Sequence, residues 1–407
     1  MSSAKPSSET APTVTKQKDA PIAQGEAGQV REATVCMLTS VHSATDVRIY
    51  EKEARSLSVA GYRVLIVAPH EKNDSREDVQ IIAVRPQGSR LRRMTQGVWD
   101  VYRKAVEIDA EVYHFHDPEL IPVGLLLRLH GKHVIYDVHE DVPRDILSKY
   151  WVWDPLRRSL GVAAEFAEAV GARSFDGICA ATPAIARRFP SPKTEVIRNY
   201  PRLDIQANLG AIPYGQRAAI CLYVGVVGVG RGAKEMIDSI ALVPEHVNAR
   251  LVLAGSYDPP GLEVEFHARP GWSRVDSVGW VSRSGVVELL GRAKVGLAIL
   301  HPTACFVESL PVKMFEYMAA GIPLVVSDFP LWRRIVGDVG CGLLVDPLNP
   351  VDIARAIGWI FTHPQEAEEM GKRGAAAVRS TYNWEQESEK LLKFYRGLTN
   401  GCRTSSL

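Results

Sequence analysis

Two glutamates lie on either side of the start of one predicted helix, in the stretch ESLPVKMFEYMAAG from Glu308 to Gly321. Seven residues separate Glu308 from Glu316, and Lys313 lies between them. Because a buried carboxylate is costly unless a partner compensates its charge, we expect both to meet a polar ligand. Lys313 and the free backbone amides at the helix start would favour an anion there. The alternative is a Glu316–Lys313 ion pair at i, i+3 on a solvated helix face.

The same stretch carries the local signals of a short helix. Pro311 suits a first helical turn, where its missing N–H is harmless. Val312, Phe315 and Ala319 then form an apolar face at the spacing of a helix. Gly321 is a typical residue just after a helix end, so the helix should stop there.

A glycine-rich loop, GVVGVGRGAKE, follows the strand-like run AICLYV. Glycines let the backbone approach a phosphate, and a guanidinium suits bidentate contact with one. The candidate phosphate contacts are Gly228, Gly230, Arg231 and Gly232. Gly228, Gly230 and Ala233 also fit a dinucleotide pattern, but ARLVLAGS ends without the acid that would hold a ribose. A nicotinamide cofactor is therefore disfavoured, and an ordinary tight strand–helix turn remains the alternative.

Polar side chains also follow two strand-like runs in the first half, VYHFH and HVIYD. His114 and His116 share one strand face, and His116 is the better functional candidate because it ends the strand. We interpret His114 as a core histidine. Candidates for acceptor binding or for a general base are Asp117, Glu119, Asp137, His139 and Glu140, some of which could instead cap helices. The offsets disfavour a metal site in HFHD.

The elements that position these residues alternate between short apolar runs and longer amphipathic ones. Expected strands in the first series span 34–38, 63–68, 79–84, 112–116, 133–137, 177–181 and 193–199. The second series spans 219–225, 249–255, 274–279, 294–300, 322–327 and 341–346. Near-continuous Val/Ile/Leu strands between helices indicate α/β domains with parallel sheets, which bind ligands beyond the carboxyl ends of the strands.

We therefore predict two doubly wound Rossmann-like domains that face each other across a cleft. Residues 32–204 would form the first, acceptor-binding domain and 205–383 the second, donor-binding domain. Residues 384–407 would form a helix that crosses back to the first domain, followed by a short tail. Residues 1–31 are rich in Ser, Thr, Pro and Gln, which predicts a disordered tail.

The composition excludes several classes of protein. With 407 residues the chain is too long for one ordinary core, and a net charge of +1 gives no general affinity for nucleic acid. The six cysteines form no Cys-x-x-Cys pair, so neither a zinc site nor a disulfide framework is expected. No signal peptide or membrane-spanning run is predicted. We expect a cytoplasmic protein, with peripheral attachment to the inner membrane face as an open alternative.

One basic segment, from Arg90 to Lys104, bears on that alternative. It contains five cations and one acid, with Met94, Val98, Trp99 and Val101 interleaved. A basic amphipathic helix can lie on an anionic membrane, which would suit a lipid-linked acceptor. A solvated helix face over a core stripe explains the same pattern equally well.

Several of these segments resemble one family. The E-x7-E pattern with its sequel FEYMAAGIPLVVSD resembles the donor-site signature of retaining GT-B glycosyltransferases of family 4, the glycosyl transferases group 1. The glycine loop YVGVVGVGRG, the second-half run VDSVGWVSRSGVVELLGRAKVGLAI and the first-half run EVYHFHDPELIPVG resemble other segments of the family. The resemblance covers nearly all of residues 33–398.

The resemblance implies roles for matching residues. Glu308 would bind hydroxyls of the donor sugar, Glu316 the ribose, and Arg231 the diphosphate whose leaving charge it would stabilise. His116 matches the family's histidine near the donor sugar and acceptor. Amides and side chains at Ser309, Leu310 and Lys313 would complete the donor site. The resemblance implies no metal and no cofactor besides the nucleotide diphosphate sugar.

The chain departs from the family pattern at two places. Leu310-Pro311 stands where the family often has Phe-Gly, so a backbone donor is lost and Lys313 is expected to compensate. The family's glycine pair after the first strand is also missing. In its place stand His42, Asp46 and Arg48, which we count as further acceptor-side candidates.

The sequence thus predicts a retaining, metal-independent glycosyltransferase that moves a sugar from a nucleotide diphosphate donor to a hydroxyl of a glycan or lipid-linked acceptor. One alternative is a sugar-nucleotide epimerase or phosphorylase of the same fold. The other is a non-catalytic nucleotide-sugar-binding protein.

Overall fold

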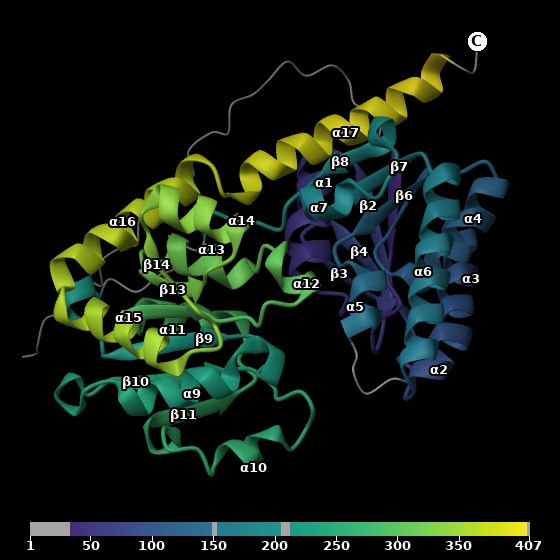
Figure 1. Ribbon diagram of the computed structural model, residues 1–407. Helices are drawn as coiled ribbons and strands as arrows, with labels where there is room; N and C mark the ends of the chain where they lie inside the picture. Colours follow the sequence, from purple (N-terminus) through teal and green to yellow (C-terminus); the bar gives the residue numbers. More distant parts are fainter. Residues whose placement is uncertain (1–32, 149–152, 205–211, 405–407) are drawn as a thin grey trace, which may run out of the picture.

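The computed structural model describes residues 33–148, 153–204 and 212–404, which form two α/β domains side by side (Figure 1). The predicted disordered tail at 1–31 lies outside the described residues. Each domain is built on its own mostly parallel sheet with helices on both faces. This confirms the predicted pair of doubly wound domains.

The first sheet has eight strands in the order β3-β4-β2-β1-β5-β6-β7-β8. Seven of them lie close to the expected positions and pair in parallel. The unexpected strand is β3, which pairs antiparallel with β4 at the sheet edge. The strands are β1 (Thr34–Leu38), β2 (Arg63–Pro69), β3 (Asp74–Arg76), β4 (Val79–Val84), β5 (Val112–Phe115), β6 (His133–Val138), β7 (Gly177–Ala180) and β8 (Thr194–Val196).

Helices cover both faces of this sheet, which is why its central strands are almost uniformly apolar and buried. The first helix begins with π-helical turns and continues as an α-helix that ends before Gly61, whose φ is +92°. The helical segments are η1 (Val47–Ala54), α1 (Arg55–Val59), α2 (Arg90–Arg92), η2 (Arg93–Gly97), α3 (Val98–Ile108), η3 (Pro118–Leu120), α4 (Ile121–Leu129), α5 (Val142–Ser148), α6 (Asp154–Ser174), α7 (Pro183–Ala186) and η4 (Ser191–Lys193).

The second sheet has six strands, all parallel, in the order β11-β10-β9-β12-β13-β14. They are β9 (Ile220–Val224), β10 (Arg250–Ala254), β11 (Val275–Gly279), β12 (Val295–Ala298), β13 (Leu324–Ser327) and β14 (Gly342–Val345). Every one of them matches a strand expected from the sequence.

The helical segments of the second domain include the donor-site candidates. They are η5 (Tyr214–Gln216), η6 (Val229–Arg231), α9 (Ala233–Leu242), η7 (Glu245–Val247), α10 (Leu262–Phe266), η8 (Trp272–Arg274), α11 (Arg283–Arg292), α12 (Ala304–Val307), α13 (Val312–Ala319), α14 (Pro330–Trp332), η9 (Arg333–Gly337), α15 (Pro350–Thr362) and α16 (Pro364–Ser380). The predicted helix after Pro311 is α13, with Phe315 and Ala319 buried as expected. Pro311 itself lies one residue before the helix, at its N-cap.

The last helix, α17 (Trp384–Thr404), runs from the second domain along the first (Figure 1). Trp384 donates from Nε1 to Ser56 Oγ at 2.9 Å, and Tyr395 Oη lies 2.8 Å from Nδ1 of His114. The helix therefore packs against the first sheet as well as following the second domain. No helix in the described ranges combines the length and the apolar composition needed to span a bilayer.

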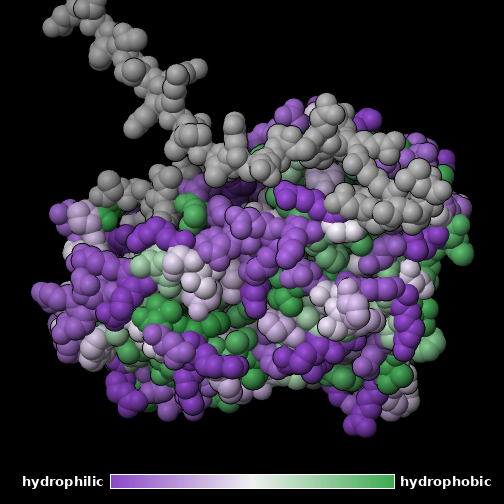
Figure 2. Space-filling model, turned by 90° about the horizontal axis from the view of Figure 1, so that it is seen from above, coloured by the Kyte–Doolittle hydropathy of each residue, from purple (hydrophilic) through white to green (hydrophobic). Residues whose placement is uncertain are grey.

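The surface seen from above is mostly hydrophilic, with smaller hydrophobic areas between (Figure 2).

The basic segment from Arg90 to Lys104 is split between core and surface. Val101 is buried and belongs to the core, whereas Met94 and Trp99 are 48% and 57% exposed. Val101 thus fits the core stripe, while contact with a membrane stays a prediction. Four of the described cysteines, Cys36, Cys179, Cys221 and Cys341, are buried as core residues with free thiols.

Candidate functional site

Glu308 lies in the loop between α12 and α13, beyond the carboxyl end of β12. Its carboxylate faces the first domain, where two arginines hold it. Arg144 Nη1 donates to Oε2 at 2.9 Å, and Arg187 Nη2 donates to Oε1 at 2.9 Å. The hydrogen bond to Glu308 raises the pKa of Arg144, ahead of smaller charge effects. The predicted sugar-binding carboxylate is thus bound by the opposite domain in this structure.

Glu316 lies inside α13, and only 9% of its side chain is exposed. Arg283, at the start of α11, donates to Glu316 Oε1 at 2.6 Å. The alternative Glu316–Lys313 pair on a solvated face is wrong, because every residue from Lys313 to Ala319 is buried. Because Arg283 donates to Oε1 alone, Oε2 of Glu316 can still accept a hydrogen bond from a ligand hydroxyl.

Lys313 points beneath the glycine loop rather than into solvent. Its Nζ lies 3.6 Å from the centre of the Tyr223 ring and has no hydrogen-bond partner among the described residues. Burial, with a smaller contribution from Arg231, lowers the pKa of Lys313 well below its usual range. Gly225, with φ of +120°, makes room for it, since a Cβ there would lie 3.1 Å from Nζ. Lys313 therefore carries a buried amine whose desolvation cost no described residue compensates by a hydrogen bond.

The glycine loop brings Arg231 close to the loop that carries Glu308. Gly232 adopts φ of +67°, and a Cβ on it would lie 2.3 Å from the Ile299 carbonyl oxygen, so only glycine fits. Gly228 and Gly230 belong to the same tight turn into α9. The Arg231 guanidinium carbon lies 5.6 Å from the centre of the Phe306 ring, in α12.

Ser309 and Leu310 help to fix the loop after Glu308. Ser309 Oγ donates to the Phe306 carbonyl at 2.8 Å, and Trp332 Nε1 donates to the Ser309 carbonyl at 2.8 Å. Leu310 packs at the edge of the second-domain core. These contacts fix the loop that carries Glu308.

In the first domain, Arg48, Asp137 and His116 form a buried hydrogen-bonded group. Arg48 donates from Nε and Nη2 to Asp137 at 2.8 and 2.6 Å, and His116 Nδ1 lies 3.0 Å from the same carboxylate. Burial alone would raise the pKa of Asp137, but the charge of Arg48 and these hydrogen bonds hold it well below its usual range. Burial lowers the pKa of His116, so its imidazole is neutral. Because Nδ1 then donates to Asp137, Nε2 keeps its lone pair.

The expectation that the candidates after these strands face an open cleft is wrong for His116, Asp117 and Asp137. His114 is buried, as expected of a core histidine. The side chains of His114, His116, Asp117 and Asp137 are at most 3% exposed. Two of the candidate histidines, His42 and His139, do reach the surface. Their Nε2 atoms lie 3.1 Å apart. The last residues of buried parallel strands can be covered by the loops that follow. A side chain at a strand end is therefore not necessarily exposed.

Asp117 orders the loop that replaces the family's glycine pair. Its Oδ2 accepts from Thr39 Oγ1 at 2.8 Å, from the Ser40 amide at 2.6 Å and from the Val41 amide at 3.2 Å. Glu119 accepts from Ser40 Oγ at 3.1 Å and from Arg93. Asp117 therefore holds backbone in place, and Glu119 joins the side chains of Ser40 and Arg93.

The remaining acceptor-side candidates divide between structure and surface. Asp46 caps η1 by accepting from the amides of Arg48 and Ile49, at 2.8 and 3.1 Å. Burial opposes its ionisation, but the hydrogen bond from His42 and these amides lower the pKa of Asp46 to about 2. Glu140 is exposed beside His139. Of these candidates, His42, Asp46, His139 and Glu140 are the most exposed to solvent.

One group of possible metal ligands exists in the described part of the chain: Glu53, His114 and His116. All three are buried. However, the Nδ1 atoms of the two histidines already contact Tyr395 and Asp137, and Arg48 Nε lies 3.1 Å from Glu53. A guanidinium beside the carboxylate opposes a second cation, and burial instead raises the pKa of Glu53 well above its usual range. The donor set does not suit a metal.

Sequence reasoning missed four cations at the junction of the domains: Lys52, Arg144, Arg187 and Arg283. Lys52 is buried, and its Nζ donates to Asn199 Oδ1 at 2.5 Å; burial lowers its pKa to about 7. Arg144 and Arg187 belong to α5 and to the end of α7, and Arg283 begins α11. The available signal for the three arginines was their place after strands β6, β7 and β11, at the carboxyl edges of the sheets.

Two family descriptions match the chain, one in each domain. A glycosyl transferase 4-like domain matches residues 48–199, and the glycosyl transferases group 1 match residues 211–377. A curated relative, D-rhamnosyltransferase WbpZ of Pseudomonas aeruginosa, is 24% identical over 162 residues. That alignment covers 40% of this chain and only 41% of the relative, so it spans less than half of each.

Solved structures with the same architecture cover most of the chain. Sucrose-phosphate synthase from Thermosynechococcus elongatus has a TM-score of 0.69 at 20% identity, over 91% of this chain and all of the other. HepE of Anabaena, solved in complex with UDP and glucose, also has a TM-score of 0.69, at 13% identity over 90% of this chain and all of the other. At these identities the likeness concerns the fold.

Proposed function

The chain belongs to the glycosyl transferases group 1, with a glycosyl transferase 4-like first domain, and from this premise we propose that it transfers a sugar from a nucleotide diphosphate donor to an acceptor hydroxyl. The observation that carries the proposal is the convergence of Glu308, Lys313, Glu316 and Arg231 on one edge of the second sheet. UDP and glucose in the structure of HepE support a nucleotide sugar as the ligand. Biosynthesis of a glycan is the expected setting.

In the proposed donor complex, Arg231 and Lys313 bind the diphosphate, together with free amides of the glycine loop and of α13. Glu316 accepts from a ribose hydroxyl, and Glu308 accepts from hydroxyls of the sugar. The buried Lys313 amine supports this arrangement because its Nζ has no hydrogen-bond partner among the described residues, and a diphosphate oxygen would supply one. The two cations also supply the charge that a divalent metal would otherwise provide, so we propose a metal-independent reaction.

We propose that transfer retains the configuration at the anomeric carbon. The bond from that carbon to the phosphate oxygen breaks while a bond to the acceptor oxygen forms on the same face. The acceptor proton passes to the departing phosphate oxygen, and the sugar passes through an oxocarbenium-like state. Arg231 stabilises the charge that develops on the phosphate. His116, buried beneath the cleft, acts by holding Asp137 and its neighbours in place rather than by proton transfer to solvent.

Donor binding can be tested by thermal shift against UDP-, GDP- and ADP-sugars. A true donor at 100 times its dissociation constant should stabilise the protein by about 2.7 kcal/mol, a shift of several degrees. Glu316→Ala should abolish this shift, because the ribose loses its carboxylate. Glu369→Ala, which removes an exposed carboxylate of α16, should leave the thermal shift unchanged. If none of the nucleotide sugars raises the melting temperature, the donor site is misassigned.

We further propose that the surface around α2 and η2 contacts an anionic membrane from the cytoplasmic side. Arg90, Leu91, Arg92 and Met94 are exposed there, so cations and apolar side chains point outward together. Such a combination favours the headgroup region of a bilayer. Arg93 is excluded from this surface because it pairs with Glu119 at 3.0 Å.

Sedimentation with vesicles tests the membrane contact. Full-length protein should sediment with anionic vesicles at low salt and remain in solution with neutral ones. Charge reversal of Arg90 and Arg92 to Glu should weaken binding at least about tenfold, since each cation contributes about 1 kcal/mol. Arg355→Glu, an exposed arginine on α15, serves as the control. Equal sedimentation of the Arg90/Arg92 variant would exclude this surface.

A further inference from the structure

Two arginines of the first domain converge on one carboxylate of the second. Arg144 binds one oxygen of Glu308 and Arg187 binds the other, each at 2.9 Å. Their side chains are 42% and 66% exposed, so both lie at an accessible surface between the domains. Among the described residues, Glu308 is the one carboxylate within ion-pair distance of Arg187; Arg144 Nε also lies 3.5 Å from Asp141.

The donor sugar would compete with this arrangement if Glu308 binds it, because each Glu308 oxygen already accepts one hydrogen bond. Sugar hydroxyls would donate to the same two oxygens that the guanidinium groups now occupy. Asp141 and Glu168 remain nearby, but Arg188 already contacts both of them. Three arginines here face three carboxylates, so diverting Glu308 to the sugar leaves one positive charge uncompensated beside the acceptor.

We propose that Arg144 and Arg187 bind a phosphate group of the acceptor, and that Glu308 occupies this site until the donor sugar draws it away. The inference rests on the proposed function, because it assumes that Glu308 turns to the sugar. It implies an ordered reaction in which the sugar binds first and creates the acceptor site. Arg144 and Arg187 are then residues that select an anionic acceptor.

The geometry favours phosphate over other ligands. The Glu308 carboxylate already places two oxygens between the two guanidinium groups, and a phosphate offers the same pair with a greater charge. The donor diphosphate does not need these arginines, since Arg231 and Lys313 of the second domain lie at its predicted site. The two phosphate sites would therefore belong to different domains and to different substrates.

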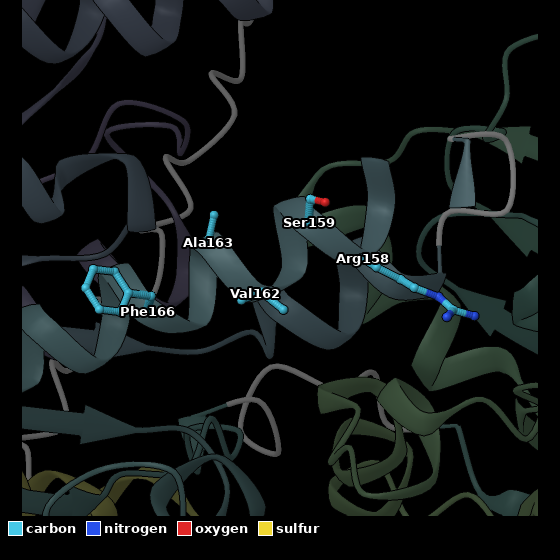
Figure 3. A pocket seen from close by; sticks show the side chains of 5 residues that line it. All are labelled: Arg158, Ser159, Val162, Ala163 and Phe166. Atoms are coloured by element: carbon cyan, nitrogen blue, oxygen red, sulfur yellow. The ribbon is translucent and has the colours of Figure 1, made fainter. Parts of the chain in front are cut away.

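The phosphate could be free or joined to a lipid, and the neighbouring helix favours the lipid. Helix α5, which carries Arg144, packs against α6; for instance, Leu147 lies beside Gly161. The outer side of α6 forms a shallow surface pocket lined by Arg158, Ser159, Val162, Ala163 and Phe166 (Figure 3). Val162 and Phe166, one turn apart on α6, are 68% and 71% exposed, so this side of the helix presents apolar side chains to solvent.

The test compares phosphate binding when the donor site holds a nucleoside diphosphate and when it holds the intact nucleotide sugar. Both ligands fill the diphosphate site, but only the second brings a sugar to Glu308. The probes are inorganic phosphate for a free source and phosphatidic acid vesicles for a lipid source. We expect at least one probe to bind about tenfold more tightly with the nucleotide sugar, as two charge-assisted hydrogen bonds become available.

Three variants sharpen the comparison. Arg144→Gln with Arg187→Gln should remove the tenfold gain while leaving affinity for the nucleotide sugar within about twofold. Glu308→Gln should produce tight phosphate binding without any sugar, because the neutral amide releases the arginines. Arg355→Gln, a remote exposed arginine, is the control and should behave as the unmodified protein.

The outcomes separate the inference from the proposed function. If nucleotide sugars bind but phosphate affinity is the same with and without the sugar, and is unaffected in the double variant, the acceptor-phosphate site is refuted. If no nucleotide sugar binds at all, the proposed function fails instead. Tighter binding of inorganic phosphate identifies a free phosphate as the source, and tighter binding of the vesicles alone identifies a lipid phosphate.

Discussion

Replacing Lys313 with methionine is expected to weaken binding of the nucleotide diphosphate sugar by about 30- to 150-fold, the equivalent of 2–3 kcal/mol for a hydrogen bond to a charged group. The same change should leave the free protein as stable as before, or more stable. Lys313 is buried against Tyr223 without a hydrogen-bond partner among the described residues, and methionine fills a similar volume without the polar amine. Isothermal titration with the donor and thermal denaturation measure the two effects.

Donor binding should also take up a proton at Lys313. In the free protein, burial and Arg231 hold the pKa of Lys313 well below its usual range, so the amine is neutral at any pH above that lowered value. A bound diphosphate favours the charged form and raises that pKa. Between the two values, affinity should fall about tenfold for each unit by which the pH rises, since only the protonated amine binds well. Titrations in buffers of different ionisation enthalpy would detect the proton.

Lys372→Met provides the control for both measurements, because Lys372 is 59% exposed on α16 and pairs with carboxylates of its own helix. Binding of the donor by Lys313→Met with unchanged affinity and unchanged pH dependence would contradict the assignment of the diphosphate site. A strong loss of stability in the same variant would show instead that the amine supports the fold.

The sequence allowed most of the fold to be predicted because buried parallel strands are short, nearly uninterrupted apolar runs. The strand that escaped prediction, β3, has the opposite character. It is the polar tripeptide Asp74–Arg76 at a sheet edge. Its turn into β4 passes through Glu77 and Asp78, which adopt φ of +45° and +65° although neither is glycine. With no apolar run and no glycine, neither the strand nor its turn had a recognisable signal.

In the candidate site, residues close together in the sequence were predicted, whereas their partners from distant parts of the chain were not. Glu308, Lys313 and Glu316 were found because one loop and one helix carry them. Their partners were not, since Arg144 and Arg187 are 164 and 121 residues away from Glu308 along the chain. Pairing over such distances depends on how the two domains face each other, which no spacing in the sequence encodes.

The opposite error occurred in the first domain, where polar residues after strands were expected to meet a ligand. Arg48 and Asp137 instead bind each other in the interior, with His116 as a third member. A bidentate arginine can lower the cost of burying a carboxylate, so polar side chains at a strand end do not have to reach solvent. Composition alone does not distinguish a ligand site from such a buried pair.

Replacing Arg48 with methionine is therefore expected to destabilise the protein by about 3–5 kcal/mol, because Asp137 would be left as a buried charge without its main partner. The melting temperature should fall on the order of 10 °C for a domain of this size. The double variant Arg48→Met with Asp137→Asn should recover part of the loss, since it removes the uncompensated charge as well. Chemical and thermal denaturation of the three proteins give the coupling between the residues.

The loss of stability in Arg48→Met should depend on pH, which lost packing alone would not produce. In the unmodified protein the lowered pKa of Asp137 contributes stability that is present above its unfolded value of about 4 and is lost as the pH falls through the folded value. In Arg48→Met, burial should instead raise the pKa of Asp137, so acidification toward pH 5 neutralises the stranded charge and narrows the gap to the unmodified protein. Arg355→Met is the matched control and should show no gap at any pH. A deficit in Arg48→Met that stays constant from pH 8 to pH 5 would mean that lost packing, and not the charge of Asp137, accounts for the instability.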